Sequence, residues 1–104
     1  MDRTQRIADL YCASALELYL DDVEALRQRA LRNLARMREQ GSASPALLAR
    51  WTAVAENPDS FRWVLTAPDA DAAELRRNHP LAGALPEGER QEIVRRTRDE
   101  PAST

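Results

Sequence analysis

The residues that could support catalysis are few, and they stand far apart in the sequence. The chain of 104 residues contains one histidine, His79, and one cysteine, Cys12. A nucleophile needs a base beside it, and a zinc site needs three or four Cys or His ligands. Cys12 falls within an apolar helical pattern, whereas His79 stands in an Asn-His-Pro sequence typical of a turn. We interpret His79 as a loop residue that orders a turn or caps a helix end, and we predict that the chain is not an enzyme.

Carboxylates and glycines give no stronger signal for a metal or a nucleotide. Asp21-Asp22 and Asp69/Asp71 both stand where a helix would begin, and capping explains them. Adding Glu74 to Asp69 and Asp71 gives a spacing that matches no known divalent-ion loop. The glycines are isolated from one another: Gly41, Gly83 and Gly88. A phosphate-binding loop needs clustered glycines, so we predict no cofactor and no metal.

Composition is typical of one small globular domain. Hydrophobic residues make up 43% of the chain and charged residues 31%, which lies outside the disordered range. The formal net charge is −2 and the pI is near 5.4, whereas dedicated nucleic-acid-binding domains usually have a pI above about 9. All 15 basic residues are arginine. Because no signal, membrane-spanning or lipidation segment is present, we expect a cytoplasmic protein that does not bind membranes.

The elements that must position these residues are all expected to be helices. Apolar residues recur with a helical period between every pair of proline, glycine or aspartate breaks. We expect two longer helices, over 4–20 and from 21–22 to about 40, followed by three or four short ones. The short helices are expected to open at Ser44-Pro45, Asn57-Pro58, Ala67-Pro68 and Pro86. The predicted fold is therefore an all-α small helical bundle, a single domain over 1–98 with a disordered tail over 99–104.

Within the first two helices the pattern also predicts ends and faces. Thr4 is the expected cap of the first helix, and Leu18 is placed on its inward face together with Ala15. Gly41 is the expected C-terminal cap of the second helix. Acidic residues open that second helix and arginines follow, which suits the helix dipole.

Arginines on one face of the second helix give the sequence its only nucleic-acid signal. Arg29, Arg32 and Arg36 share that face, without interleaved aromatic residues. A solvated face is the simpler interpretation, and no later helix carries the polar base-reading side chains of a recognition helix. A small DNA-binding transcriptional regulator therefore remains the alternative function.

The two tryptophans are predicted to differ. Trp51 falls on the apolar face of the third helix with Leu48, so we expect it in the core. In the fourth helix Phe61 and Val64 can face inward together, which leaves Trp63 outward or at an edge. Exposed tryptophan beside arginine is typical of a binding hot spot.

One segment resembles a known prokaryotic family. Residues 74–85, ELRRNHPLAGAL, and the following PEGER are similar to a motif near the end of small helical antitoxins. These antitoxins are encoded beside nucleotidyltransferase-like toxins of the AbiEii/MenT kind. The opening residues 6–10, RIADL, are similar to the start of the same proteins. The likeness covers about half the chain, and Leu81 and Gln91 stand where the family pattern has aromatic residues.

The resemblance implies a toxin-antitoxin role based on protein–protein interaction. The partner would be a cognate nucleotidyltransferase-like toxin, and homo-oligomerisation is left open. We expect Trp63, Arg76 and Arg77 to contact the partner because they lie on or near exposed parts of short helices. His79 and Leu81, from the resembling segment, complete the expected partner-binding surface.

Overall fold

The protein is all-helical over the part that its computed structural model describes, residues 2–100. This confirms the expected fold class, two longer helices followed by four shorter ones. The elements are α1 (Arg3–Leu18), the short 3-10 helix η1 (Leu20–Asp22), α2 (Val23–Gln40), α3 (Pro45–Ala55), α4 (Pro58–Val64), α5 (Ala70–Arg77) and α6 (Glu87–Asp99). Among the described residues no helix has both the length and the apolar composition needed to cross a membrane.

Local capping signals decide where most helices begin. Side chains of Asp22, Ser44 and Asn57 each accept a hydrogen bond from the backbone N–H three residues later, as the sequence predicts. The first helix differs, because Asp2 rather than Thr4 is its cap, with Asp2 Oδ1 2.8 Å from the Gln5 nitrogen. At the other end of α2, Gly41 has the left-handed φ of 63° that ends a helix.

Two boundaries differ from those predicted. Helix α5 begins at Ala70 and not at Ala67-Pro68, and Asp69 occupies its N-cap position without the side-chain hydrogen bond expected of a cap. The predicted tail over 99–104 also begins too early, because Asp99 is the last residue of α6 and Glu100 pairs with Arg6 at 3.1 Å. Residues 101–104 of that tail lie outside the described part of the chain.

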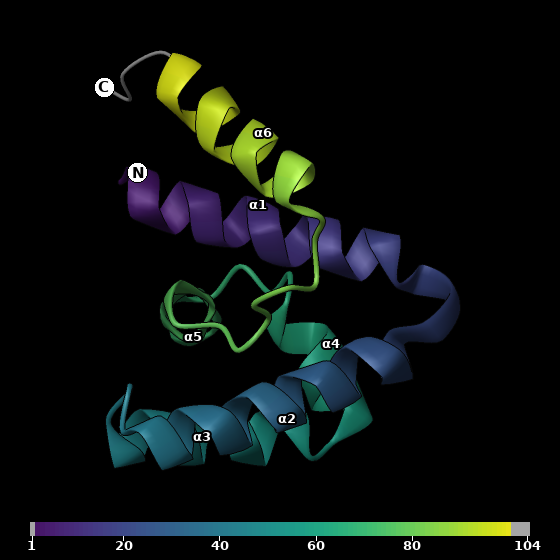
Figure 1. Ribbon diagram of the computed structural model, residues 1–104, viewed down its shortest axis with the longest axis vertical. Helices are drawn as coiled ribbons and strands as arrows, with labels where there is room; N and C mark the ends of the chain where they lie inside the picture. Colours follow the sequence, from purple (N-terminus) through teal and green to yellow (C-terminus); the bar gives the residue numbers. More distant parts are fainter. Residues whose placement is uncertain (1, 101–104) are drawn as a thin grey trace.

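The helices form two pairs with a middle layer between them (Figure 1). Helix α6 lies beside α1 and runs in the opposite direction, while α2 and α3 lie side by side at the other end of the long axis. Helices α4 and α5 lie between these pairs, where α5 contacts α1 and α4 contacts α2 and α3. The first helix is therefore held mainly by the last two helices of the chain.

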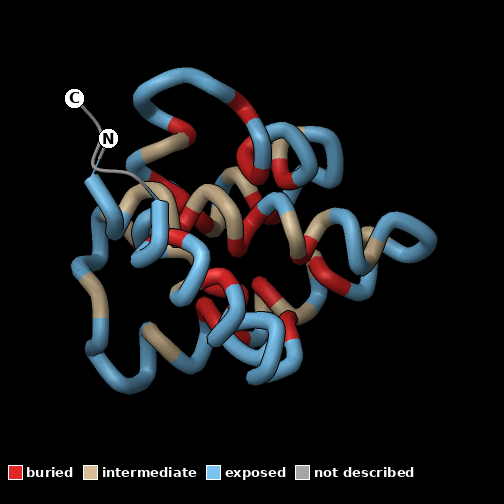
Figure 2. The backbone as a smooth tube through the Cα atoms, turned by 90° about the horizontal axis from the view of Figure 1, so that it is seen from above, coloured by how far each residue is buried: buried red, intermediate tan, exposed pale blue. Residues whose placement is uncertain are grey.

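In a view from above, along the long axis, the buried segments of the backbone gather toward the centre of the molecule and the exposed segments surround them (Figure 2). Trp51 is completely buried, as predicted, and its indole Nε1 donates to the Leu75 carbonyl oxygen at 2.8 Å. Cys12 is also fully buried, and this burial raises the pKa of its thiol to about 12. A thiol held in that state is a packing residue rather than a nucleophile.

Candidate protein-interaction surface

Trp63 is the largest side chain that the fold leaves exposed. Half of its surface, 50%, is accessible to solvent, whereas Phe61, Val64 and Leu65 in the same segment are fully buried. The helical period explains the difference, because Phe61, Val64 and Leu65 share one face of α4 and Trp63 falls outside it. This confirms the predicted orientation of α4.

Helix α4, which carries Trp63, is held in place by its N-terminal cap and by its buried face. Asn57 caps it through a 3.0 Å contact from its Oδ1 to the Ser60 nitrogen, and Pro58 occupies the first turn. Arg62 is exposed beside Trp63 and forms no ion pair with any described residue. An indole and a guanidinium therefore stand together on a helix whose inward face is fixed by the core.

Arg76 was expected on the surface, and this expectation is wrong. Its side chain is buried, and its Nε lies 2.9 Å from Asp9 Oδ1. Its Nη1 donates to the carbonyl oxygens of Val64, at 2.9 Å, and Ala67, at 2.8 Å. The last carbonyls of a helix have no partner within the helix, and Arg76 supplies one at the end of α4. The guanidinium thus joins α1, α4 and α5, and it is not free to contact a partner.

Asp9 is held by more than the arginine. Its Oδ1 also accepts a 2.8 Å hydrogen bond from Gln5 Nε2, which in turn donates to the Ala73 carbonyl oxygen at 2.9 Å. The result is a network in which Gln5 Nε2 and the Nε and Nη1 donors of Arg76 all have acceptors, and which ties α1 to α5 along their contact. A satisfied network of this kind fixes the relative position of helices.

Arg77, next along α5, is exposed as expected. Its Nη1 lies 3.1 Å from Asp2 Oδ2, and both side chains remain largely solvated. The backbone N–H of Gln5 is the main group that lowers the pKa of Asp2, and Arg77 lowers it further. Exposed pairs of this kind hold side chains loosely, so Arg77 remains available to a partner.

Leu81 and His79 are tied into the fold by the loop between α5 and α6. Leu81 is completely buried, so it is a core residue, and the expectation that it contacts a partner is wrong. The His79 ring stacks on Tyr11 with centroids 4.6 Å apart, and its Nδ1 accepts a hydrogen bond from the Leu81 N–H at 3.2 Å. Burial lowers the pKa of His79 to about 4, so the ring is neutral in the folded protein.

Side chains of α1 and α2 also hold the same loop, through hydrogen bonds to its backbone. Tyr11 donates its hydroxyl to the Leu81 carbonyl oxygen at 2.9 Å and accepts from the Leu85 N–H at 3.3 Å. Asn33 donates to the carbonyl oxygens of Pro80, at 2.9 Å, and Ala82, at 3.2 Å. The loop between α5 and α6, which makes up most of the segment that resembles antitoxins, is therefore held in place by hydrogen bonds between side chains of α1 and α2 and four of its backbone groups.

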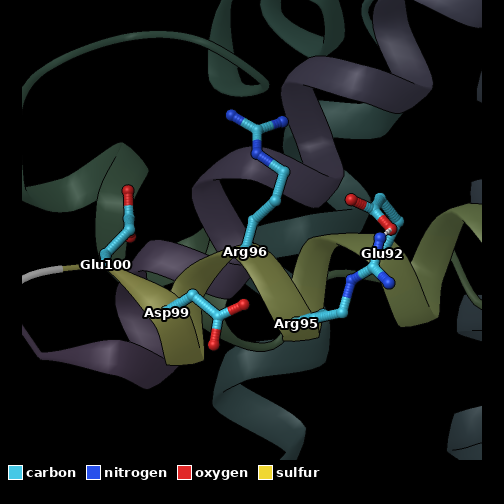
Figure 3. A pocket seen from close by; sticks show the side chains of 5 residues that line it. All are labelled: Glu92, Arg95, Arg96, Asp99 and Glu100. Atoms are coloured by element: carbon cyan, nitrogen blue, oxygen red, sulfur yellow. Dashed lines mark hydrogen bonds and ion pairs between the residues drawn. The ribbon is translucent and has the colours of Figure 1, made fainter.

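The end of α6 forms a shallow hollow of about 630 Å³ (Figure 3). Its lining carries charges of both signs: Glu92, Arg95, Arg96, Asp99 and Glu100. Arg95 points to Glu92 and pairs with it, while Glu100 pairs with Arg6. Because carboxylates and guanidinium groups are mixed around its lining, the hollow offers no concentrated charge of one sign to a small ligand. Within residues 2–100 no three His, Cys, Asp or Glu side chains lie close enough to hold a metal ion.

One exposed apolar surface, at the junction of α1 and α2, was not predicted from the sequence. Leu18 was placed on the inward face, but Leu18 and Leu20 are each 52% exposed. The inward face continues instead from Ala15 to Tyr19, which is four residues on and packs partly buried against the core. That spacing is visible in the sequence and could have identified Leu18 as an outward residue.

No family model, no curated protein and no solved structure matches this chain.

Proposed function

We propose that this chain is a non-enzymatic protein-interaction domain, and that its principal contact is the face of α4 bearing Trp63. The observation that carries the proposal is the half-exposed indole on a helix whose other apolar side chains are completely buried. A rigid, partly exposed tryptophan is the side chain that most often dominates a protein–protein interface. Because the helix is already ordered, binding costs little conformational entropy.

We further propose that the partner is a nucleotidyltransferase-like toxin and that this chain acts as its antitoxin. The resemblance of residues 74–85 and 6–10 to small helical antitoxins supports this role. An enzyme that transfers nucleotides carries acidic metal-binding residues, and the exposed guanidinium groups of Arg62 and Arg77 are complementary to such a surface. The contact set expected from the sequence is thus revised to Trp63, Arg62 and Arg77, because Arg76 and Leu81 are buried and the His79 ring is stacked on Tyr11.

Coexpression with the product of the adjacent gene tests the proposal. We expect the two proteins to elute together from a sizing column and the neighbour to arrest growth when it is expressed alone. Trp63→Ala should weaken the complex by at least about tenfold, which is typical of a hot spot. Arg98→Ala, at an exposed position on α6, is the matched control and should bind like the unmodified chain.

One result would contradict the antitoxin role, and another would contradict only the assignment of the contact to α4. The two proteins could elute apart while the neighbour remains harmless, or Trp63→Ala could rescue growth as well as the unmodified chain does. In the second case the complex would exist but would not depend on α4.

A small DNA-binding regulator is the second candidate function. The observation that favours it is the exposed pair Arg32 and Arg36, neither of which lies within ion-pair distance of a carboxylate in the described part of the chain. Binding to phosphates releases counterions and weakens steeply as salt rises. A shift of the chain's own promoter DNA at physiological salt, lost at high salt and in Arg32→Glu/Arg36→Glu, would favour the regulator.

A further inference from the structure

A second hollow, of about 270 Å³, opens where α1 meets the middle layer of helices (Figure 1). Side chains of α1, of α5 and of the segment that joins α4 to α5 line it. At roughly 30 Å³ for each water molecule, the hollow has room for an organic group of several heavy atoms. Unlike the hollow on α6, it has a buried charged side chain in its wall, that of Arg76.

Arg76 keeps one nitrogen without a hydrogen-bond partner. Its Nε and Nη1 donate to Asp9 Oδ1 and to two backbone carbonyl oxygens, but Nη2 has no acceptor among the described residues. Every buried side-chain nitrogen or oxygen in that part of the chain has a partner, so Nη2 must be accessible to solvent. The side chain as a whole is only 6% exposed. Because Arg76 lines the hollow, Nη2 is the polar atom that it offers there.

Asp9 offers a hydrogen-bond acceptor beside this donor. Its Oδ1 accepts from Gln5 at 2.8 Å and from Arg76 at 2.9 Å. Its Oδ2 accepts from no described residue, and Asp9 also lines the hollow. In a guanidinium group the Nε–H and one N–H of Nη2 point to the same edge, which is the edge that binds a carboxylate. That edge faces Asp9, so an open donor and an open acceptor are neighbours in the wall of the hollow.

The charges around this hollow cancel one another. Asp9 pairs with Arg76, and Arg6, which also lines the hollow, pairs with Glu100 at 3.1 Å. An anionic ligand would lie against the free carboxylate oxygen of Asp9, and a cationic ligand would lie against Nη2 of Arg76. Both arrangements bring like charges together, which is unfavourable. A neutral group that contains both an acceptor and a donor is therefore the complement of this site.

Among neutral groups, a primary carboxamide has the required shape. Its carbonyl oxygen and one N–H of its NH2 group point to the same side, so the oxygen can accept from Nη2 while the N–H donates to Oδ2. A peptide bond is almost always trans, which points its C=O and N–H in opposite directions. Most of the remaining lining is apolar and suits a short alkyl group, with Leu10 and Ala13 from α1 and Leu65 and Pro68 from the connecting segment.

We propose that this hollow is a binding site for a primary carboxamide that carries a small branched alkyl group. The carbonyl oxygen accepts from Arg76 Nη2, the N–H donates to Asp9 Oδ2, and the alkyl group covers Leu10 and Leu65. The other contacts of Arg76 prevent its guanidinium from turning outward, so only a group that enters the hollow reaches Nη2. The donor is already in place, and binding therefore costs little conformational entropy.

Two-dimensional ¹H–¹⁵N NMR with isobutyramide measures the binding directly. A ligand of so few atoms binds weakly, so we expect a dissociation constant in the millimolar range. The shifts should be confined to residues that line the hollow, with the Nε–H signal of Arg76 among them. Isobutyrate and N-methylisobutyramide carry the same alkyl group on a carboxylate and on a trans amide. Each lacks one of the two hydrogen bonds and should bind at least about tenfold more weakly.

Equal shifts with all three compounds, or shifts spread over the whole molecule, would overturn the proposal. N-acetylglutamine N-methylamide presents the same carboxamide on a peptide, since a glutamine side chain bears this group. If it binds more tightly than isobutyramide, the natural ligand is a side chain of another protein. If it binds more weakly, the natural ligand is a free amide.

Asp9→Asn exchanges the open acceptor for a donor and should reverse the preference. The asparagine carbonyl oxygen can keep the contacts that Oδ1 makes, while its NH2 group takes the place of Oδ2. The hollow then presents two donors and has one negative charge fewer, so isobutyrate should bind more tightly than isobutyramide. Circular dichroism verifies that the helices are retained. An unchanged order of the two ligands would exclude Oδ2 as the acceptor and overturn the proposal.

Ala13→Leu tests the location without changing the polar pair. Ala13 is exposed on α1 and lines the hollow, so a leucine there should obstruct it and weaken isobutyramide binding at least about tenfold. Ala53→Leu, at an exposed position on α3, is the matched control and should bind like the unmodified chain. Trp63→Ala should also bind normally, so failure of the antitoxin proposal and failure of this one are distinguishable. Binding that survives Ala13→Leu would overturn the assignment to this hollow.

Discussion

Replacing Arg76 with alanine should destabilise the fold severely. The change removes the donor to the carbonyl oxygens of Val64 and Ala67 and the ion pair to Asp9. Each buried group left without a partner costs about 1–3 kcal/mol. Asp9 is partly exposed and can recover some hydration, so the ion pair adds less. We expect a total loss of about 3–5 kcal/mol of unfolding free energy, in the range measured for breaking a buried pair.

That loss is large for a domain of this size, whose total stability is about 5–15 kcal/mol. Urea denaturation followed by circular dichroism measures it directly. Arg77→Ala is the matched control, because Arg77 is the next residue of the same helix and its pair with Asp2 is solvated; we expect little change. The reasoning would be refuted if the two variants unfolded at the same urea concentration. Arg76→Lys should fall between them, because a lysine keeps the charge but cannot serve three acceptors in one plane.

Three further predictions concern the stability of the fold: one for the two tryptophans, one for His79 and one for two of the glycines. Trp51→Ala should lose about 3–5 kcal/mol in urea denaturation, whereas Trp63→Ala should lose little; equal losses would contradict the orientation of α4. The fold favours the neutral form of His79, whose pKa is about 4. The contribution of His79 to the unfolding free energy should therefore be fully present above about pH 6.5. It should then fall by up to about 3 kcal/mol as the pH drops towards 4. In His79→Asn the unfolding free energy should no longer fall between pH 6.5 and 4.5 because of this group. If it falls as in the unmodified chain, the histidine is not the source of the pH dependence. Gly83→Ala should destabilise by about 1 kcal/mol or more, because φ is +81° and a Cβ would lie 3.0 Å from an arginine side chain. Gly88→Ala, a helical position with open space, should instead raise the melting temperature.

Features encoded by neighbouring residues were predictable from the sequence. The caps at Ser44 and Asn57 are confirmed, and of the two aspartates that the sequence offers before α2, Asp22 is the cap. The opposite orientations of Trp51 and Trp63 also follow from helical spacing alone. These predictions needed no knowledge of which helices touch.

The burial of Arg76 depended on distant residues and was not predicted. The helical period did place it on the inward stripe, four residues after the buried Ala72. A charged side chain in that position is normally interpreted as exposed, since its burial requires acceptors that the local sequence does not show. Those acceptors come from α4 and from Asp9 at the start of the chain. The packing of α5 against both α1 and α4 brings them together.

The packing of α1 has a consequence for folding during synthesis. Helix α1 emerges from the ribosome before α5 and α6, the two helices with which it makes its main contacts. Synthesis proceeds at roughly 5–20 residues per second. Several seconds therefore pass between the synthesis of the face bearing Tyr11, Cys12 and Ala15 and that of the helices that cover it. During that interval an apolar helix face is exposed to other nascent chains and to chaperones. Ribosome-bound chains that end before α5 should therefore associate with chaperones, and chains extended past α6 should be released from them.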